Sequence, residues 1–561
     1  MENQIKFNTI VNVATYLHDM ARNQPYKRAV VCPCGRDDDG RVAYTHFTFS
    51  QLDRESDRLA WGLKNAGVDR GVRTILMVKP SLDFFALVFA LFKVGAVPVV
   101  VDPGMGVMRM LNCLRESRAR ALVGIPPAHV LRTLAPAYFK SVRTFITVGR
   151  RWLWGGPTLR KIRRGQEEAP YPMADTRADE IAAILFTTGS TGPAKGVVYT
   201  HGVFDAQVRN IRAQFGITPE EIDLPTFPLF ALFDPALGMT AIIPDMDPTQ
   251  PAKVDPRKIV EAVVNHGVTN MFASPALLNR VGRFGKQMGI KLPTLRRVIS
   301  AGAPASPANI EQFSALLDGD ACIHTGYGAT EAMPVSSFSS REILKETRRL
   351  SEQGYGMCVG LPIAGVDVRI IRILDGPIAG WSDDLTVSQG EIGEIVVRGD
   401  QVTRGYFERP RDDVLSKIHD GDTLWHRMGD LGWLDKKGRI WFCGRKSHRV
   451  TTATTTLFTI PCEALFNNHP TVFRSALVGV GPQARQQPVI CIELEPGNHG
   501  LDKNGLEKEL LQIARANPIT ESIRTVLFHP SFPVDIRHNS KIFREKLAGW
   551  AEKRIRKERK C

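Results

Sequence analysis

The chain has 561 residues, which is too long for one ordinary domain and long enough for a large core with an accessory unit. Hydrophobic residues make up 43% and charged residues 23%, and these proportions exclude a disordered protein. The formal net charge is +15, and the polar first residues lack the basic start and apolar run of a secretory signal, so we expect a cytoplasmic protein.

Helix-like and strand-like segments alternate through the first part of the chain. Residues 49–67 carry apolar side chains at helical spacing and end in glycine, which predicts a helix. The most apolar stretch, 84–101, is interrupted by Lys93 and Pro98, which favours a buried helix followed by a buried strand over a membrane span. Further buried strands are predicted at 74–80, 121–127, 144–149 and 182–190. Such alternation is typical of parallel sheets covered by helices, an α/β architecture.

Basic residues form two clusters in the sequence. The second occupies 553–560, and the first consists of Arg150, Arg151, Arg160, Lys161, Arg163 and Arg164. One interpretation is ordinary solvated surface. The other is attraction to an anionic partner such as a lipid surface, an acidic protein or a polyanionic substrate. No nucleic-acid recognition motif accompanies the charge, so we do not expect nucleic acid as a partner.

The pattern changes after about residue 390. Residues 390–406 and 430–445 contain short strands with turn signals, which predicts a β-rich subdomain over about 390–445. From Lys446 onward, strand-like and helix-like segments predict a compact α+β unit of roughly 110 residues. We therefore expect an N-terminal domain over 1–445 and a C-terminal domain over 446–561.

A loop rich in glycine and hydroxyl side chains follows the strand predicted at 182–190. The segment LFTTGSTGPAKGVVYTHG spans 185–202, and it is not the P-loop of nucleotide triphosphatases, which would need glycine at Ala194. Glycines allow close backbone approach, hydroxyls and amides donate to phosphate oxygens, and a lysine adds positive charge. The sequence thus predicts a phosphate-binding loop containing Thr187, Thr188, Gly189, Ser190, Thr191, Gly192 and Lys195.

This loop resembles the phosphate loop of the AMP-forming acyl and aryl ligases, the family of acyl-CoA synthetases, adenylation domains and firefly luciferases. Other segments are similar to motifs of that family and follow in its order: SAGAP at 300–304, YGATE at 327–331, GDLG at 429–432, GR at 444–445 and NSKI at 539–542. The resemblance covers nearly the whole chain. It implies a large domain of parallel sheets with a small mobile C-terminal domain, and a loop that holds the β- and γ-phosphates of ATP.

The resemblance also implies roles for single residues. Lys541 would be the C-terminal catalytic lysine, Thr330 would face the phosphates and Glu331 would hold Mg²⁺. These charges suit the attack of a carboxylate on the α-phosphate, because such reactions depend mostly on positioning and electrostatics. Asp430 would accept hydrogen bonds from the ribose hydroxyls. The implied ATP site is completed by Arg445, by Tyr327 stacked on adenine with Gly328 beside it, and by Gly302, Ala303 and Pro304 on the adenine side.

Apolar residues occupy the positions where this family lines its acid pocket. Core packing would explain them equally well, but an apolar pocket would suit a fatty acid-like substrate. Ala231 stands where many fatty acyl and acetyl ligases carry histidine or an aromatic residue, so the usual gate is not expected. The predicted pocket residues are Phe230, Ala231, Phe233, Phe272 and Met333.

The segment after the expected hinge departs from the pattern of acyl-CoA synthetases. Ser447 occupies the hinge position, and Ala453 and threonines replace the glycines of the loop that lines the pantetheine tunnel in those enzymes. Threonine does not allow the backbone geometry or the close approach that glycine allows. The sequence therefore predicts adenylation without transfer to the thiol of CoA.

Residues 94–106 and 185–202 look strongly like those of one subgroup of the family, the olefin-biosynthesis β-lactone synthetases. In that chemistry a 2-alkyl-3-hydroxy fatty acid is adenylated, and its own 3-hydroxyl then closes a β-lactone and expels AMP. Assembly with other enzymes of olefin biosynthesis is a further expectation. His201 and His448 are candidates for the base only by chemical type. The alternatives are a fatty acyl-CoA or acyl-AMP ligase and a non-catalytic scaffold.

Overall fold

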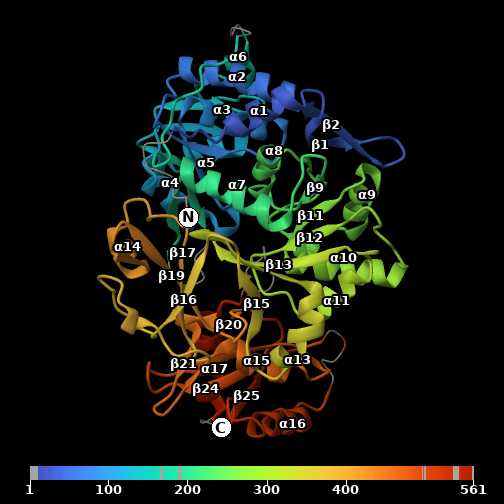
Figure 1. Ribbon diagram of the computed structural model, residues 1–561, viewed down its shortest axis with the longest axis vertical. Coiled ribbons are helices and arrows are strands. Elements are labelled where there is room, and N and C mark those ends of the chain that lie inside the picture. The colour runs from blue at the N-terminus through green and yellow to red at the C-terminus, as the bar shows by residue number, and fades with distance from the viewer. Residues whose placement is uncertain are drawn as a thin grey trace.

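The structure is a computed structural model that describes residues 10–164, 169–187, 193–495, 497, 501–534 and 542–558. In Figure 1 the first part of the chain lies at the top and the C-terminal elements, in orange and red, lie at the bottom. Two large sheets with helices packed on them form most of the protein, which confirms the predicted α/β class. None of the helices within these ranges has both the length and the apolar character needed to cross a bilayer.

The first sheet has six strands among the described residues. Its strands run parallel except for the last, which pairs antiparallel with its neighbour. In spatial order they are β6 (Thr144–Thr147), β5 (Ala121–Gly124), β3 (Arg73–Met77), β4 (Val97–Val101), β7 (Ile181–Thr187) and β8 (Lys195–Thr200). The helices of this region are α1 (Thr15–Asn23), α2 (Phe49–Asn65), α3 (Leu82–Val94), α4 (Val107–Glu116), α5 (Pro126–Leu134) and α6 (Leu159–Arg163).

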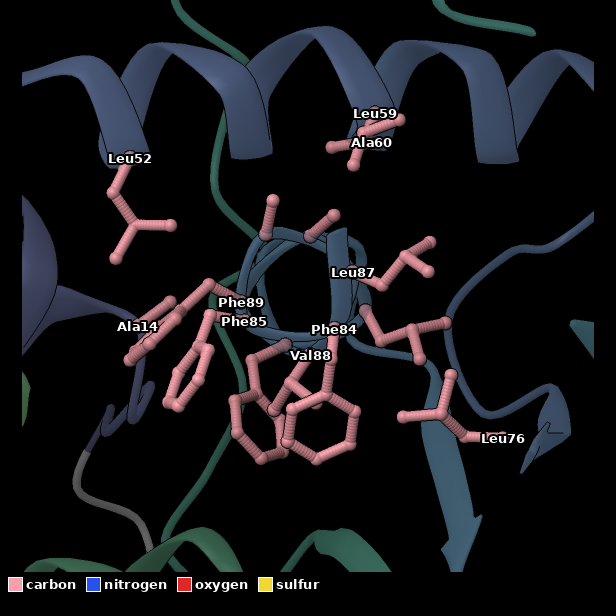
Figure 2. Close-up of a cluster of buried hydrophobic side chains, with 14 of the residues drawn as sticks. Ala14, Leu52, Leu59, Ala60, Leu76, Phe84, Phe85, Leu87, Val88 and Phe89 are labelled. Atoms are coloured by element: carbon pink, nitrogen blue, oxygen red, sulfur yellow. The ribbon is translucent and has the colours of Figure 1, made fainter. Parts of the chain in front are cut away.

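Helix α3 lies at the centre of the largest apolar core. Figure 2 looks along its axis and shows phenylalanine side chains on one side and α2 above it. The Ser81 hydroxyl accepts a hydrogen bond from the Phe84 amide at 3.3 Å to start the helix, and Gly95 ends it at a φ of 76°. Strand β4 follows directly, which confirms the helix and strand predicted at 84–101. Lys93 is buried with its ammonium 2.6 Å from both Asp53 and Asp57.

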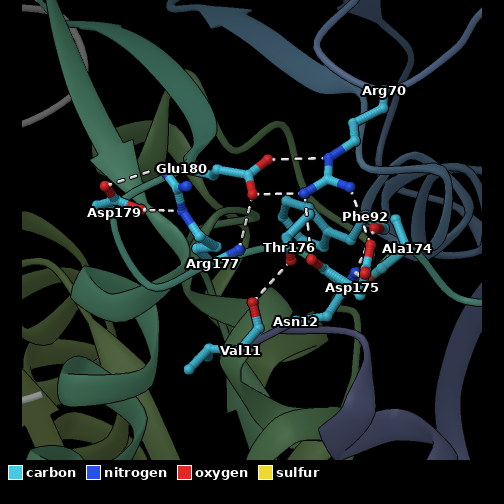
Figure 3. A network of polar contacts seen from close by, with 10 residues as sticks. All are labelled: Val11, Asn12, Arg70, Phe92, Ala174, Asp175, Thr176, Arg177, Asp179 and Glu180. Carbon is cyan, nitrogen blue, oxygen red and sulfur yellow. Dashed lines mark hydrogen bonds and ion pairs between the residues drawn. The ribbon is translucent and has the colours of Figure 1, made fainter. Parts of the chain in front are cut away.

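A polar network fixes the segment that leads into β7 (Figure 3). The Arg70 guanidinium contacts both carboxylate oxygens of Glu180, at 3.0 and 2.5 Å, and the Asp175 carboxylate at 2.9 Å. The Asn12 amide donates to two backbone carbonyls, at 2.9 and 3.0 Å, that lie on separate segments of the chain. Strand β7 therefore begins at a fixed position, and the predicted phosphate loop follows its other end in the sequence.

The second sheet contains fourteen strands in the described part of the chain. Strand β18 (Lys417–Asp420) pairs with β19 at its side. The remaining strands, in spatial order, are β16 (Asp367–Ile371), β17 (Gly393–Arg398), β19 (Thr423–Leu434), β20 (Ile440–Arg445), β15 (Met357–Pro362), β14 (Ala332–Ser339), β13 (Cys322–Ala329), β12 (Arg297–Ser300), β11 (Asn270–Ala273), β9 (Ile222–Pro225), β10 (Thr240–Ile242), β1 (Arg28–Arg36) and β2 (Val42–Thr48).

In the spatial order from β13 to β1, leaving out β2, neighbouring strands are parallel. The neighbours from β13 through β14 and β15 to β20, and on to β19, pair antiparallel. The antiparallel strands confirm the β-rich character predicted for 390–445. The short helices α12 (Ser340–Glu342), α13 (Arg348–Glu352) and α14 (Pro410–Ser416) belong to connections. The helices that accompany the parallel part are α7 (His201–Phe215), α8 (Phe233–Leu237), α9 (Pro256–His266), α10 (Pro275–Met288) and α11 (Pro307–Ser314).

The last part of the chain has a separate three-stranded sheet and its own apolar cores. Helices lie beside this sheet in Figure 1, which agrees with the predicted α+β character. The elements of this part are β23 (Val472–Val480), β24 (Gln487–Leu494), β25 (Thr525–Phe528), α15 (Thr459–Asn467), α16 (Lys503–Arg515) and α17 (Arg544–Glu558). A two-stranded hairpin, β21 (Val450–Thr451) and β22 (Thr456–Leu457), precedes them.

Candidate active site

A cavity of about 1460 Å³ lies at the carboxyl ends of parallel strands of the second sheet. Its wall includes Phe227 just beyond β9, Ser274 just beyond β11 and Gly302 just beyond β12. Ligands of open α/β sheets bind at this edge. The volume exceeds the range of about 300–1,000 Å³ found for sites of drug-sized ligands, so the cavity has room for a nucleotide and a long acyl group together.

Three predicted ATP-site residues meet at one side of the cavity. Tyr327 on β13 donates its hydroxyl hydrogen bond to Oδ2 of Asp430 at 2.8 Å. Asp430 on β19 lies opposite Arg445 of β20, and the guanidinium is 3.1 Å from Oδ1. Burial and the Asp430 charge raise the pKa of Tyr327, and Asp430 raises the pKa of Arg445. Tyr327 and Arg445 line the cavity, whereas Asp430 is buried behind them as the anion that fixes both.

Thr330 and Glu331 occupy the tight turn between β13 and β14, and hydrogen bonds from three directions hold this turn. The Tyr406 hydroxyl donates to Oε1 of Glu331 at 2.8 Å, and the Tyr199 hydroxyl donates to the Thr330 carbonyl at 2.5 Å. The amide and hydroxyl of Thr403 both donate to the Glu331 carbonyl, at 2.8 and 3.1 Å. Both predicted residues line the cavity, and the carboxylate of Glu331 is oriented by a hydroxyl that the motif itself does not contain.

Lys195 begins β8 and also reaches the cavity. Its ammonium is 2.7 Å from the Asp412 carboxylate and 4.8 Å from the centre of the Tyr406 ring. Tyr406 therefore contacts both Glu331 and Lys195, two charged groups from separate predicted motifs. Of the remaining loop residues, Thr187 pairs opposite Lys195 in the β7–β8 ladder. Thr188, Gly189, Ser190, Thr191, Gly192 and the catalytic candidate Lys541 lie outside the described residues.

Four of the five predicted acyl-pocket residues line the cavity, and three of these four are phenylalanines. The rings of Phe230 and Phe272 stack with their centres 4.0 Å apart and their planes at 20°, and Phe233 lies 6.3 Å from Phe230. These three residues and Met333 line the cavity. Ala231 does not: it is fully buried in the core between its neighbours. On the adenine side, Gly302 and Gly328 line the cavity, but Ala303 and Pro304 are not part of its wall.

The cavity also has polar wall residues that sequence reasoning missed. Asp223 and Asp234 are both buried, and burial raises the pKa of both carboxyls, so the pair retains a proton to higher pH than an exposed carboxyl would. The Asn270 amide donates to Asp223 at 2.5 Å. His426 is a further buried wall residue, and burial lowers its pKa. None of these residues lies in a recognisable motif, so only the fold brings them to the cavity.

The two histidines considered as bases lie elsewhere. His201 is 1% exposed in the core, where Nδ1 accepts a hydrogen bond from the Val13 amide at 3.3 Å. Burial lowers the pKa of His201 to about 4. His448 lies 3.5 Å from Glu545 of α17. Neither histidine belongs to the cavity wall, although Ser447, at the predicted hinge, does.

The threonine-rich segment folds as a closed hairpin. Strands β21 and β22 pair through Val450 with Leu457 and Thr451 with Thr456. In the turn, the Thr452 amide donates to the Thr455 carbonyl at 2.9 Å, and the Thr452 hydroxyl oxygen accepts from the amides of Thr454 and Thr455 at 3.2 and 3.0 Å. Threonine thus stabilises a turn of its own here instead of providing the open backbone of a glycine loop.

The donor set at Glu331 fits magnesium. Among the described residues, no group of three or more His, Cys, Asp and Glu side chains is arranged to hold a metal ion. Mg²⁺ commonly binds through one or two carboxylates together with phosphate oxygens of its substrate, rather than in an all-protein site. A single carboxylate, oriented by the same tyrosine whose ring contacts Lys195, is consistent with that mode.

Comparison with known proteins identifies the family. A profile described as "AMP-binding enzyme" matches residues 17–407. The olefin β-lactone synthetase of Xanthomonas campestris pv. campestris is 47% identical over 97% of this chain and 98% of its own length. That of Stenotrophomonas maltophilia is 46% identical over 98% of this chain and all of its own length.

A solved structure agrees in fold. ATP-bound MatB from Rhodopseudomonas palustris superimposes with a TM-score of 0.76 over 96% of this chain and 99% of its own, at 20% sequence identity. At that identity the likeness concerns the fold alone. The long match to the family profile and the full-length similarity of the two bacterial synthetases carry the assignment. The chain belongs to the AMP-binding enzyme family, as an AMP-forming ligase related to the olefin β-lactone synthetases.

Proposed function

We propose that this enzyme adenylates a long-chain 2-alkyl-3-hydroxy fatty acid with ATP and converts the adenylate into a β-lactone, AMP and pyrophosphate. The observation that carries this proposal is the 46–47% identity, over nearly the whole chain, to two olefin β-lactone synthetases. The size of the cavity and its aromatic wall support a bulky apolar acid.

Adenylation follows from the charges around the cavity. Lys195 and the loop at 187–192 bind the leaving phosphates, and Tyr327 stacks on adenine. Asp430, which contacts Tyr327 and Arg445, accepts hydrogen bonds from the ribose hydroxyls. Glu331, oriented by Tyr406, holds Mg²⁺, which supplies positive charge to the phosphate oxygens. Lys541 neutralises charge on the reacting phosphate. The roles of Thr330 and Lys541 rest on their positions in the family motifs.

Ring closure needs little from the protein beyond positioning. The 3-hydroxyl oxygen forms a bond to the acyl carbon, the bond from that carbon to the AMP oxygen breaks, and the hydroxyl proton is released. Because the nucleophile is already attached to the acid, proximity replaces the binding of a second substrate. The closed Thr452 turn supports this route, since it does not provide the glycine loop expected of a pantetheine tunnel. Neither His201 nor His448 lines the cavity, and we assign the base role to neither.

Two further parts of the proposal concern organisation. Residues 446–561 form a C-terminal domain that turns about Ser447 and carries Lys541 to the cavity, with residues 1–445 as the adenylation domain. The enzyme works in the cytoplasm on a small-molecule acid, in assembly with enzymes that make the hydroxy acid and decarboxylate the lactone. Its basic clusters provide peripheral contact with a membrane or an acidic partner.

The experiment is incubation of the enzyme with ATP, Mg²⁺ and a 2-alkyl-3-hydroxy acid, with and without CoA, followed by identification of the products. We expect AMP, pyrophosphate and β-lactone whether or not CoA is present. A matched acid without the hydroxyl should be adenylated and then retained as acyl-AMP or released slowly. Efficient conversion of this deoxy acid into a CoA thioester would replace the proposal with the alternative, a long-chain fatty acyl-CoA ligase.

A further inference from the structure

Two large apolar side chains stand out from the surface between β6 and α6. Leu153 is 104% exposed and Trp152 is 59% exposed. They are neighbours in residues 149–156, which we call the tryptophan loop. A fully exposed leucine beside an exposed tryptophan is costly in water unless a partner covers the pair.

The tryptophan loop is held in a fixed shape rather than left as a loose connection. The indole of Trp154 stacks on His129 of α5, with ring centres 5.3 Å apart, and its N–H donates to the Thr147 hydroxyl at 2.9 Å. The Arg151 guanidinium donates to the Gly156 carbonyl at 2.7 Å. Gly156 has a φ of 92°, and a Cβ there would lie 2.2 Å from the Phe145 carbonyl oxygen. These contacts point Trp154 inward and leave Trp152 and Leu153 at the tip.

The sequence that flanks this tip is basic. Residues 145–164 contain six arginine or lysine residues and no Asp or Glu, and the next acidic residues in sequence, Glu167 and Glu168, lie outside the described residues. Arg163 is turned inward to Glu55 and Asp83, at 2.5 and 2.6 Å. The other five, Arg150, Arg151, Arg160, Lys161 and Arg164, are exposed. A tryptophan and a leucine flanked in sequence by exposed basic side chains match the two layers of a membrane surface, which has anionic headgroups above an apolar interior.

We propose that the tryptophan loop docks this enzyme on an anionic lipid surface, with Trp152 and Leu153 in the interfacial layer and the surrounding basic residues on the headgroups. The proposed function includes membrane contact through charge alone, and this proposal adds a defined loop to that contact. The benefit of docking to substrate uptake rests on the proposed function. The same helix α5 that holds Trp154 through His129 lines the cavity with Ala128 and Leu131, so the docked face adjoins the wall of the apolar site. Two apolar side chains bury far less surface than the roughly 1,600 Å² of a standard protein interface. This difference in area favours lipid over a protein partner.

The test is co-sedimentation of the full chain with vesicles of equimolar phosphatidylcholine and phosphatidylglycerol, with pure phosphatidylcholine for comparison. Trp152→Ser/Leu153→Ser and Arg150→Glu/Lys161→Glu should each weaken binding to the anionic vesicles at least about tenfold. The matched control is Val264→Ser/Met288→Ser, which removes two side chains that are 60% and 62% exposed elsewhere and should bind like the parent.

All variants should adenylate a soluble short-chain 3-hydroxy acid at the parental rate, which separates a failure of docking from a failure of the proposed function. Absence of vesicle binding by the parent, equal binding to both vesicle types, or unchanged binding by Trp152→Ser/Leu153→Ser would overturn the proposal. A change of oligomeric state in that variant, without vesicle binding by the parent, would assign the loop to a protein contact instead.

Discussion

Tyr406→Phe should slow adenylation by removing the hydroxyl that orients Glu331. The lost bond is the 2.8 Å contact from the phenol hydroxyl to Oε1 of Glu331. The aromatic ring below Lys195 and the bond from the Tyr406 amide to Asp413 at 2.7 Å remain in the variant. A hydrogen bond to a charged group contributes about 1.5–3 kcal/mol, and if this is lost in the transition state the rate falls roughly 10- to 150-fold.

The assay is exchange of labelled pyrophosphate into ATP in the presence of a 3-hydroxy acid, measured over a range of Mg²⁺ concentrations. Because Tyr406 orients the proposed magnesium ligand, the deficit should be largest at low Mg²⁺ and partly recovered at high Mg²⁺. Tyr26→Phe, which removes a hydroxyl from a side chain that is 89% exposed, is the matched control and should behave like the parent. A Tyr406→Phe rate close to the parental rate at limiting Mg²⁺ would refute the orienting role of this hydroxyl.

Lys541→Ala should reduce the adenylation rate on the order of 10²-fold or more while changing ATP affinity much less, because the lysine charge is needed at the reacting phosphate. Equal losses of rate and of affinity would place the lysine in substrate binding. Stability should depend on pH through His201. Its pKa is lowered to about 4 in the folded state, so it binds its proton more readily when unfolded, and stability falls as pH decreases from about 6.5 to about 4. The full loss is about 3 kcal/mol, and denaturant unfolding of His201→Leu at pH 7 and pH 4.5 should show a smaller difference than the parent; the same difference in both proteins would contradict the assignment.

Several residues of the recognisable motifs line the cavity, although Ala303 and Pro304 of the SAGAP motif do not. Tyr327, Glu331 and Arg445 come from segments far apart in the chain, and they reach one cavity as the motif order predicts. The α/β alternation was equally readable, because buried strands such as β4 and helices such as α2 have distinct apolar periods. Ala231 was misplaced because its motif position says nothing of side-chain direction on a short turn.

Other residues had no signal in the sequence. Tyr406 reaches Glu331 and Lys195 because it forms a bridge with Val197 of β8, a contact between segments more than two hundred residues apart. Asp223 and Asp234 look like ordinary strand and helix residues until the sheet places them in the cavity wall. Long-range contacts of this kind depend on tertiary packing, which neither local propensity nor motif spacing encodes.

The continuity of the second sheet affects how this protein can be shortened. The match to the family profile ends at residue 407, but β15 pairs with β20, and β17 pairs with β19, both of which come later in the chain. A fragment ended at 407 would leave the long edge of β15 and one edge of β17 without partners. Unpaired edges recruit other chains and aggregate. A truncated protein for expression should therefore retain β20 through Arg445, since the end of the sequence match is not the end of the folded unit.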